Sequence, residues 1–329
     1  MTTRRDAAEG AVMGALAGDA AGAVLEFIGR PITPGDVEHA MSMPGGGVWN
    51  VAPGQITDDG ELTMCLLTAL AAGDGARRRA AERYAAWVAS DPFDIGATTA
   101  ASLGSLRDVG FRAIAEVHGP DVAMERAAAA RCMASKANGS LMRASPLGVW
   151  GALHDDEATA AAAIADAKMS HPNAACTDAA AAYAIAIASL VRAPGDRETA
   201  IARAKAWVGA HADGEVRGWL GDALDGRLPG FTPQDGFVRI AFTHAFAHLA
   251  RGSDWESAVR ETLAGGGDTD TNACIVGGLV GAACGVTAIP ARARSAVLEC
   301  DHTRASSPRP EWLHPRAAPA LVATILGGA

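Results

Sequence analysis

The sequence predicts an all-α fold in which residues 1–329 form one compact bundle of helices. The chain is rich in alanine, and its apolar residues recur with the period of a helix over long stretches. No stretch alternates between apolar and polar residues in the way typical of a β-strand. The breaks between helical stretches are too short to act as free linkers, and a chain with 49% hydrophobic residues can bury a large core. We therefore expect a single domain.

The expected helices follow one another along the whole chain. In order, they cover residues 6–27, 61–73, 76–89, 97–107, 121–135, 156–169, 174–192, 197–211, 235–251, 254–264, 272–285 and 317–326. Pro and Gly interrupt the helical pattern at residues 31–53, 91–96, 171–172, 194–195, 228–233 and 306–315.

Two of these helices carry a ridge of glycine. Glycine recurs every fourth residue at Gly10, Gly14, Gly18 and Gly22, and again at Gly277, Gly281 and Gly285. Glycine inside a helix costs about 1 kcal/mol relative to alanine, so such a ridge indicates that another backbone comes close. We expect the two helices to cross in the centre of the bundle, the alternative being a glycine-rich composition without packing meaning.

Two acidic clusters lie some 200 residues apart, each at the start of an apolar helix. The first is Thr57-Asp58-Asp59, and the second is Asp268-Thr269-Asp270-Thr271. Adjacent residues do not share a helix face, so we place Asp58 and Asp59 in the turn before their helix. Asp268 and Asp270 are two residues apart and would point the same way in an extended segment.

The chemistry of these clusters favours a metal site. Four carboxylates and two flanking hydroxyls offer oxygen donors, which hard divalent cations prefer. If the fold brings the clusters together, their repulsion, about 4 kcal/mol for a pair 4 Å apart near a protein surface, must be relieved by protonation or by a cation. Capping of the two helix N-termini is the simpler alternative.

Composition limits the other functions. A net charge of −9 disfavours a general nucleic-acid surface or an anionic-membrane surface. The six cysteines form no CxxC pair, and the first residues show no signal-peptide pattern, so we expect a reduced, cytoplasmic protein and a monomer. The apolar run at residues 273–289 is the candidate for a membrane-spanning helix. Its 17 residues are just too few to span a bilayer, and we interpret it as a core helix.

Sequence pieces in a fixed order resemble the ADP-ribosylglycohydrolase family. They are Gly14 to Ala20 through Glu26-Phe27, Thr57-Asp58-Asp59, Asp94-Ile95-Gly96 with Thr98-Thr99, Asn138-Gly139-Ser140-Leu141-Met142-Arg143, Ser170-His171, and Gly265-Gly266-Gly267-Asp268-Thr269-Asp270-Thr271. Each piece alone is weakly specific, whereas their order and the presence of both acidic motifs are specific. The resemblance covers most of the chain.

The resemblance implies an all-α bundle whose central cleft holds two Mg²⁺ or Mn²⁺ ions. It also implies a hydrolase that cleaves the glycosidic bond between ADP-ribose and an acceptor, such as an arginine or serine side chain or another molecule. The implied metal ligands are Thr57, Asp58, Asp59, Asp268, Asp270 and Thr271. The carboxylates available for acid or base catalysis are Glu26, Asp59 and Asp268. The implied substrate-binding residues are Asp94, Gly96, Asn138, Gly139, Ser140, Met142, Arg143, His171, Gly266 and Gly267.

Two other functions remain open: a two-metal phosphohydrolase acting on a nucleotide, and a non-catalytic ADP-ribose-binding relative. Several residues also have two possible roles. Arg143 pairs either with a phosphate or with a structural Asp, and His171 contacts either ribose or only the protein. Asp94 is a candidate for binding a cationic acceptor such as a guanidinium. The backbone N–H groups of residues 138–140 are suited to bind a diphosphate.

Three further expectations concern single positions. Glu26 is four residues beyond Gly22, so a continuous helix would carry it along the glycine ridge toward the second acidic cluster. Gly60 stands where the family often has Thr and could loosen the turn there; Ser170 similarly replaces a commoner Thr. His244 and His248 share one helix face without the Glu of an HExxH motif, so we assign them to packing or to the surface.

Overall fold

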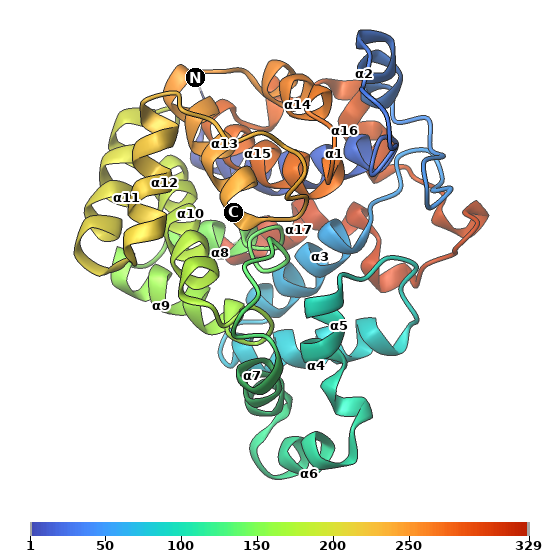
Figure 1. The fold of residues 1–329 in the computed structure, drawn as a ribbon, viewed down its shortest axis with the longest axis vertical. Coiled ribbons are helices and arrows are strands. Elements are labelled where there is room, and N and C mark those ends of the chain that lie inside the picture. The colour runs from blue at the N-terminus through green and yellow to red at the C-terminus, as the bar shows by residue number, and fades with distance from the viewer. Residues whose placement is uncertain (1, 328–329) are drawn as a thin grey trace.

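The computed structural model describes residues 2–327 and confirms the all-α prediction. Within this range the β-structure is confined to two isolated bridges, Gly46–Val51 and Ala137–Phe237. The α-helices (Figure 1) are α1 (Arg4–Gly22), α2 (Pro34–Met41), α3 (Asp58–Ala71), α4 (Ala76–Ala89), α5 (Ala97–Leu103), α6 (Val109–His118), α7 (Pro120–Arg131), α8 (Ser145–Gly151), α9 (Asp156–Ala167), α10 (Ala174–Arg192), α11 (Arg197–His211), α12 (Gly214–Leu224), α13 (Val238–Arg251), α14 (Trp255–Ala264), α15 (Thr269–Cys284), α16 (Ala291–Leu298) and α17 (Ala318–Ile325).

The structure contains helices that the sequence pattern did not predict, namely α2, α6, α8, α12 and α16. The expected break at residues 31–53 contains α2, because Thr33 forms a capping box with Asp36 and Pro34 occupies the first helical position, where proline is tolerated. Helix α6 is amphipathic and packs against α7 at the periphery, but none of its residues is fully buried. Helix ends also differ: the helix expected at 6–27 stops at Gly22, and that expected at 121–135 stops at Arg131.

The predicted crossing of the two glycine ridges is confirmed. Helices α1 and α15 lie side by side in the centre of the molecule (Figure 1) and pack against each other more extensively than any other pair of described helices. A Cβ at Gly10 would lie 2.2 Å from the carbonyl oxygen of Gly281, and one at Gly14 would lie 2.2 Å from that of Gly277. Because contacts run forward along α1 and backward along α15, the two helices are antiparallel.

The long apolar helix α10 supports this central pair from one side. By length and composition α10 is the one described helix apolar enough to cross a membrane, but 89% of its most apolar window is buried inside the protein. Its neighbours are α8, α9 and α11, which cover its apolar surface. The run at residues 273–289, which the sequence singled out, instead includes the buried second half of α15 and ends as a helix at Cys284.

The backbone contact predicts opposite effects for one substitution at two glycines. Gly14→Ala should destabilise the protein by about 1–3 kcal/mol, because its methyl group has no space against Gly277. Gly218→Ala, in the middle of α12, meets no atom within 4 Å and should stabilise by up to about 1 kcal/mol. Thermal unfolding followed by circular dichroism measures both. Similar melting temperatures for the two variants would contradict the role of the ridge.

Candidate metal and substrate site

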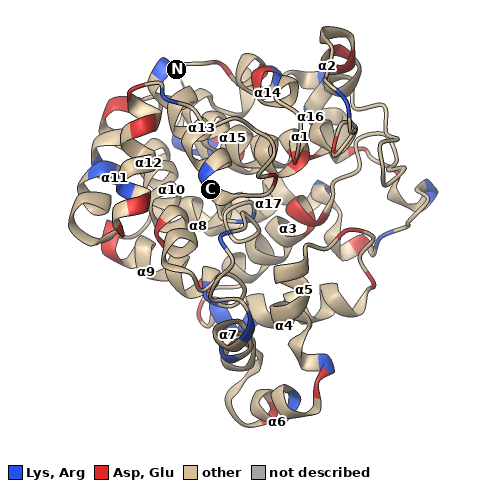
Figure 2. Cartoon of the chain, viewed as in Figure 1, with Lys and Arg blue, Asp and Glu red and all other residues tan. Residues whose placement is uncertain are grey.

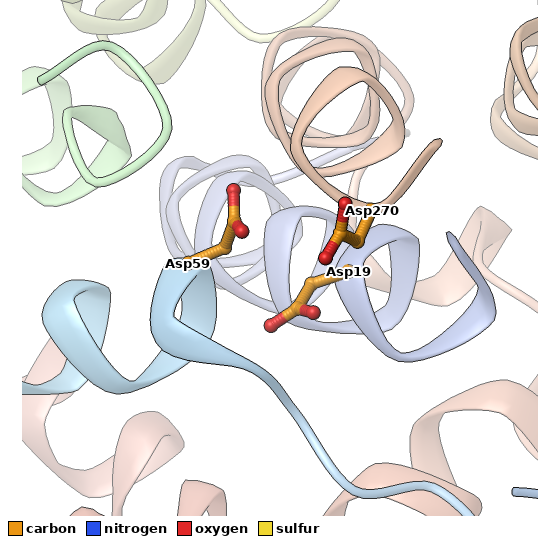
Figure 3. Close-up of side chains that lie close together, drawn as sticks. All are labelled: Asp19, Asp59 and Asp270. Carbon is orange, nitrogen blue, oxygen red and sulfur yellow. The ribbon is translucent and has the colours of Figure 1, made fainter. Parts of the chain in front are cut away.

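Acidic side chains from distant parts of the chain converge at one end of the α1–α15 pair. Carboxylate oxygens of Asp19, Asp59 and Asp270 lie within 4.8 Å of one another, and those of Glu26, Asp94 and Asp270 do the same. Figure 3 shows the first three side chains coming from three different helices, α1, α3 and α15. Asp270 belongs to both groups, so the two acidic motifs of the sequence meet in one cluster.

The antiparallel contact explains how the second motif reaches the first. At the end of α1, a Cβ at Gly22 would lie 2.3 Å from Cα of Asp270, so the two backbones touch there. The chain then turns, and the Phe27 N–H donates to the carbonyl of Gly267 at 3.1 Å. Glu26 therefore lies beside Asp270 as expected, but a turn brings it there, and the expectation of a continuous helix through Glu26 was wrong.

Helix capping does not explain the two motifs. The expectation that Asp58 and Asp59 lie in a turn was wrong, since α3 begins at Asp58 and both occupy its first turn. Thr57 precedes α3 and Asp268 precedes α15, yet neither side chain makes a capping hydrogen bond. The acidic side chains are thus free to face one another, although the helix N-termini still favour negative charge.

Asp19 is a site residue that the sequence analysis quoted but did not assign. It is fully buried in α1, and its carboxylate accepts hydrogen bonds from the N–H and Oγ1 of Thr57 and from the Gly60 N–H. A Cβ at Gly60 would lie 2.6 Å from Asp19 Oδ2, so glycine fits the start of α3 tightly and does not loosen it. The sequence could have pointed to Asp19, because it is the single acidic residue among the otherwise uncharged residues of the glycine ridge, residues 10–22.

Burial and mutual repulsion make the ionised cluster unfavourable. Burial raises the pKa of Asp19 to about 7 and that of Asp94 to about 6, and burial together with Asp94 raises the pKa of Glu26 to about 8. Burial, and then the acidic neighbours, raise the pKa values of Asp58, Asp59 and Asp270 well above the ordinary value of an aspartate. Figure 2 shows acidic segments near the starts of α3 and α15, while Lys and Arg lie largely on outer helices such as α7 and α11.

The donor set fits a hard divalent cation. Every side chain of the two motifs offers oxygen, and Asp59 Oδ1 is buried without a hydrogen-bond partner. An ionised oxygen without a partner is costly inside a protein. A cation among these carboxylates would satisfy that oxygen and offset the repulsion.

A cavity of about 300 Å³ opens above the cluster and is lined by most of the expected substrate-binding residues. These are Asp94, Gly96, Asn138, Gly139, Met142 and His171, together with Glu26, Asp58, Asp268, Asp270 and Thr271. No Lys or Arg of the described chain lines it. Asn138 Nδ2 donates to Asp268 Oδ2 at 2.7 Å and so orients that carboxylate toward the cavity.

Of the two roles that the sequence left open for Arg143, the structure shows the pairing with a structural Asp. Its side chain is fully buried, and its guanidinium donates to Asp166, Ser170 and the Gly139 carbonyl. Burial within this network leaves no face of Arg143 toward the cavity. The buried Ser140 hydroxyl also does not line it.

Two other sets of residues lie away from this cavity. Gly266 and Gly267 line a neighbouring cavity of about 630 Å³, which shares Phe27 with the first. His244 and His248 are buried and hydrogen-bonded to Pro229 and Ser253, so their assignment to packing is confirmed.

His171 and the loop before α8 form a further part of the cavity wall. His171 Nδ1 lies 2.9 Å from Ser170 Oγ, and burial lowers the pKa of its imidazole to about 3, so the ring is neutral. Gly139 must be glycine, because a Cβ would lie 2.8 Å from His171 Cε1. The Asn138 N–H is bound to the Gly236 carbonyl, whereas within residues 2–327 the N–H groups of Gly139 and Ser140 have no acceptor. Of the three N–H groups, that of Gly139 both lies on the cavity wall and remains free for an anion.

Comparison with known proteins gives matches over the whole chain. The family profile described as ADP-ribosylglycohydrolase matches residues 1–323. A protein of Acanthamoeba polyphaga mimivirus whose name places it among the ADP-ribosyl glycohydrolases is 27% identical, with 90% of this chain and 92% of the viral protein covered. A solved structure titled ADP-ribosylglycohydrolase-related protein complex superimposes with a TM-score of 0.73 at 26% identity, covering 99% of this chain and 98% of the other.

Two bacterial enzymes match over shorter stretches. The ADP-ribosyl-dinitrogen reductase glycohydrolase of Rhodospirillum rubrum is 40% identical over 98 residues, which cover 28% of this chain and 32% of that enzyme. An ADP-ribosylarginine hydrolase of Pseudomonas putida is 44% identical over 61 residues, covering 18% of this chain and 15% of the enzyme.

The buried carboxylates predict an unusual pH dependence for the metal-free protein. Their folded-state pKa values lie above those of an unfolded chain, so they lower the free energy of unfolding progressively as the pH rises from about 4 to 8. Asp58→Asn removes one of them and should raise the melting temperature in EDTA by a few degrees at pH 8, with a much smaller change at pH 5.

The matched control is Asp36→Asn on the surface. There Arg30 and Thr33 lower the pKa of Asp36, so its ionised form stabilises the fold, and the same substitution should lower the melting temperature at pH 8. A fall for both variants at pH 8 would show that Asp58 supports the fold rather than straining it.

Proposed function

The chain belongs to the ADP-ribosylglycohydrolase family, and we propose that it is a metal-dependent hydrolase that cleaves the glycosidic bond between ADP-ribose and an acceptor. The observation that carries this proposal is the meeting of the two acidic motifs beneath one cavity, with a buried Asp59 oxygen that lacks a partner. The names of the family and of its relatives indicate an ADP-ribosyl glycohydrolase.

We assign the metal to the residues of the two motifs. They are Thr57, Asp58, Asp59, Asp268, Asp270 and Thr271. Asp19 would hold this shell in place, since it is bonded to Thr57 and Gly60 and shares a cluster with Asp59 and Asp270. When bound, two Mg²⁺ or Mn²⁺ ions supply Lewis acidity toward ribose hydroxyls and water.

The three candidate acid–base carboxylates differ in their access to the cavity. Asp59 is fully buried and does not line it, so we assign Asp59 to metal binding alone. Asp268 lines the cavity and is oriented by Asn138, which suits it to hold a ribose or a water in place. Glu26 lines the cavity from a turn outside the two metal-binding motifs, so its carboxyl group can reach a bound substrate, and we assign proton transfer to Glu26.

The part of the cavity wall formed by His171 and the loop before α8 suits ADP-ribose. Neutral His171 presents an uncharged ring to a sugar, and the free N–H group of Gly139 suits a phosphate oxygen. The transition state of glycoside cleavage carries positive charge on the sugar. Asp94 and Glu26 at the mouth would stabilise that charge.

Arginine is the acceptor that we propose. Glu26 and Asp94 line the cavity without a described Lys or Arg to neutralise them, which suits a cationic guanidinium. Relatives in Pseudomonas putida and Serratia proteamaculans are named ADP-ribosylarginine hydrolases. We propose the cytoplasm as the compartment, because all six cysteines are free thiols and five of them are buried.

Product analysis with and without metal tests the proposal. ADP-ribosylated arginine and serine peptides are incubated with the protein in EDTA and then with added Mg²⁺, Mn²⁺ or Zn²⁺. We expect free ADP-ribose and an intact arginine peptide, no turnover in EDTA, and better recovery with Mg²⁺ or Mn²⁺ than with Zn²⁺ because all donors are oxygen. Release of AMP or orthophosphate would instead establish a phosphohydrolase, and full activity of the metal-stripped protein would rule out metal dependence.

Glu26→Gln tests the assignment of proton transfer. The variant keeps the shape of the side chain and removes its titratable group, so kcat should fall by about 10²–10⁴-fold. ADP-ribose affinity, measured by calorimetry, should stay within about tenfold, because the other residues that line the cavity, including Asn138, Gly139 and His171, are unchanged. Glu116→Gln on the exposed helix α6 is the matched control and should have wild-type kcat. Wild-type turnover by Glu26→Gln would exclude this role.

A further inference from the structure

Trp49 makes the most specific contact to the proposed acid. Its indole Nε1–H donates to Glu26 Oε2 at 2.6 Å. We propose that Trp49 is a positioning residue, which fixes the Glu26 carboxyl in the orientation used for proton transfer. This inference rests on the proposed function, since it concerns the residue assigned there to that step.

The backbone around Trp49 places the indole beside the Glu26 carboxylate. Gly46 and Val51 exchange two backbone hydrogen bonds, of 2.8 and 2.9 Å, and so close a short loop with Trp49 near its tip. Gly47 has a φ of +68°, and a Cβ there would lie 2.3 Å from the Ala23 carbonyl. The loop is therefore seated directly on the turn that carries Glu26.

The loop does not need Trp49 to keep its shape. Besides the Gly46–Val51 pair, the Asn50 side chain bonds to Ser306 in the C-terminal segment. Val48 at the tip is 55% exposed, whereas the bulkier Trp49 is half-buried and points back to the acid. The indole contact is thus additional to the bonds that hold the loop.

The chemistry of the contact selects one carboxylate oxygen. An indole N–H is a donor and never an acceptor, and Glu26 Oε2 is the oxygen that it engages. Trp49 therefore distinguishes the two oxygens of the Glu26 carboxyl group and stops the group from rotating.

Trp49 also joins two acidic segments at the mouth of the cavity. Its ring centroid lies 6.2 Å from that of Phe93, the residue directly before Asp94. Glu26 and Asp94 belong to one carboxylate group with Asp270. One indole thus holds Glu26 by a hydrogen bond and contacts the Asp94 segment by its ring.

Trp49→Phe tests the inference, since it removes the N–H and keeps an aromatic ring. A hydrogen bond to a charged group is strong enough that we expect kcat to fall about tenfold or more on ADP-ribosylated arginine peptide. KM should stay within about threefold and the melting temperature within about 2 °C. Trp312→Phe, at a partly exposed tryptophan beside Arg83, is the matched control and should behave as wild type.

A double mutant separates positioning from a general structural effect. If Trp49 acts through Glu26, Trp49→Phe should cause no further loss of kcat in a Glu26→Ala protein. An unchanged kcat in Trp49→Phe alone, or the same tenfold loss in the Glu26→Ala background, would overturn the inference and leave the proposed function standing.

An NMR measurement tests the contact without turnover. The indole N–H signal that disappears in Trp49→Phe should shift clearly in Glu26→Ala, and the other indole signals should stay in place. No shift would overturn the inference. If the wild-type protein releases ADP-ribose from no substrate, the proposed function fails, and this signal alone decides whether Trp49 holds Glu26.

Discussion

The backbone contact between α1 and α15 is the constraint on which the rest of the structure depends. Glycine at each crossing point lets the two helices touch without intervening side chains, at a spacing that any Cβ would prevent. The contact is maintained up to Gly22, where the backbone meets Asp270, so the register of the two helices decides where the second acidic motif lies. Asp19, one turn earlier on α1, then reaches the start of α3 and fixes the first motif as well.

This arrangement places like charges where solvent cannot screen them. Buried carboxylates raise one another's pKa values, and each ionisation in the absence of a counter-ion lowers stability. Only a rigid framework can hold such a cluster together, and the apolar contacts of α10, α13 and α14 around the central pair supply it. Functional sites in stable folds carry local strain, and the well-packed residues around them compensate for it.

The sequence was sufficient for the parts of the site that depend on regular helices. Glycine spacing predicted the crossing, and the acidic residues at two helix starts indicated an oxygen-rich site on the condition that the fold brought them together. The sequence was insufficient where an irregular backbone places a residue, or where a side chain has more than one possible partner. Glu26 reaches the cluster by a turn, and Arg143 is bonded to Asp166 from a helix whose placement no local pattern reveals. Trp49 lies on a loop whose shape follows from glycines with positive φ at residues 45–47, which the sequence showed only as a break.

The site thus combines two kinds of support. Helix starts hold the metal-binding motifs rigidly, whereas turns and loops carry Glu26 and Asp94 at the mouth. The segment that carries Asp94 is held by a buried ion pair, in which Arg309 bonds to Glu61 of α3 and to the backbone carbonyls of Ser90 and Asp91. Burying that pair is costly unless both partners are fully bonded, and here the bonding extends to the segment that leads into Asp94. The C-terminal segment, far from the acidic motifs in sequence, therefore positions the mouth of the site through Arg309 as it anchors the Trp49 loop through Ser306.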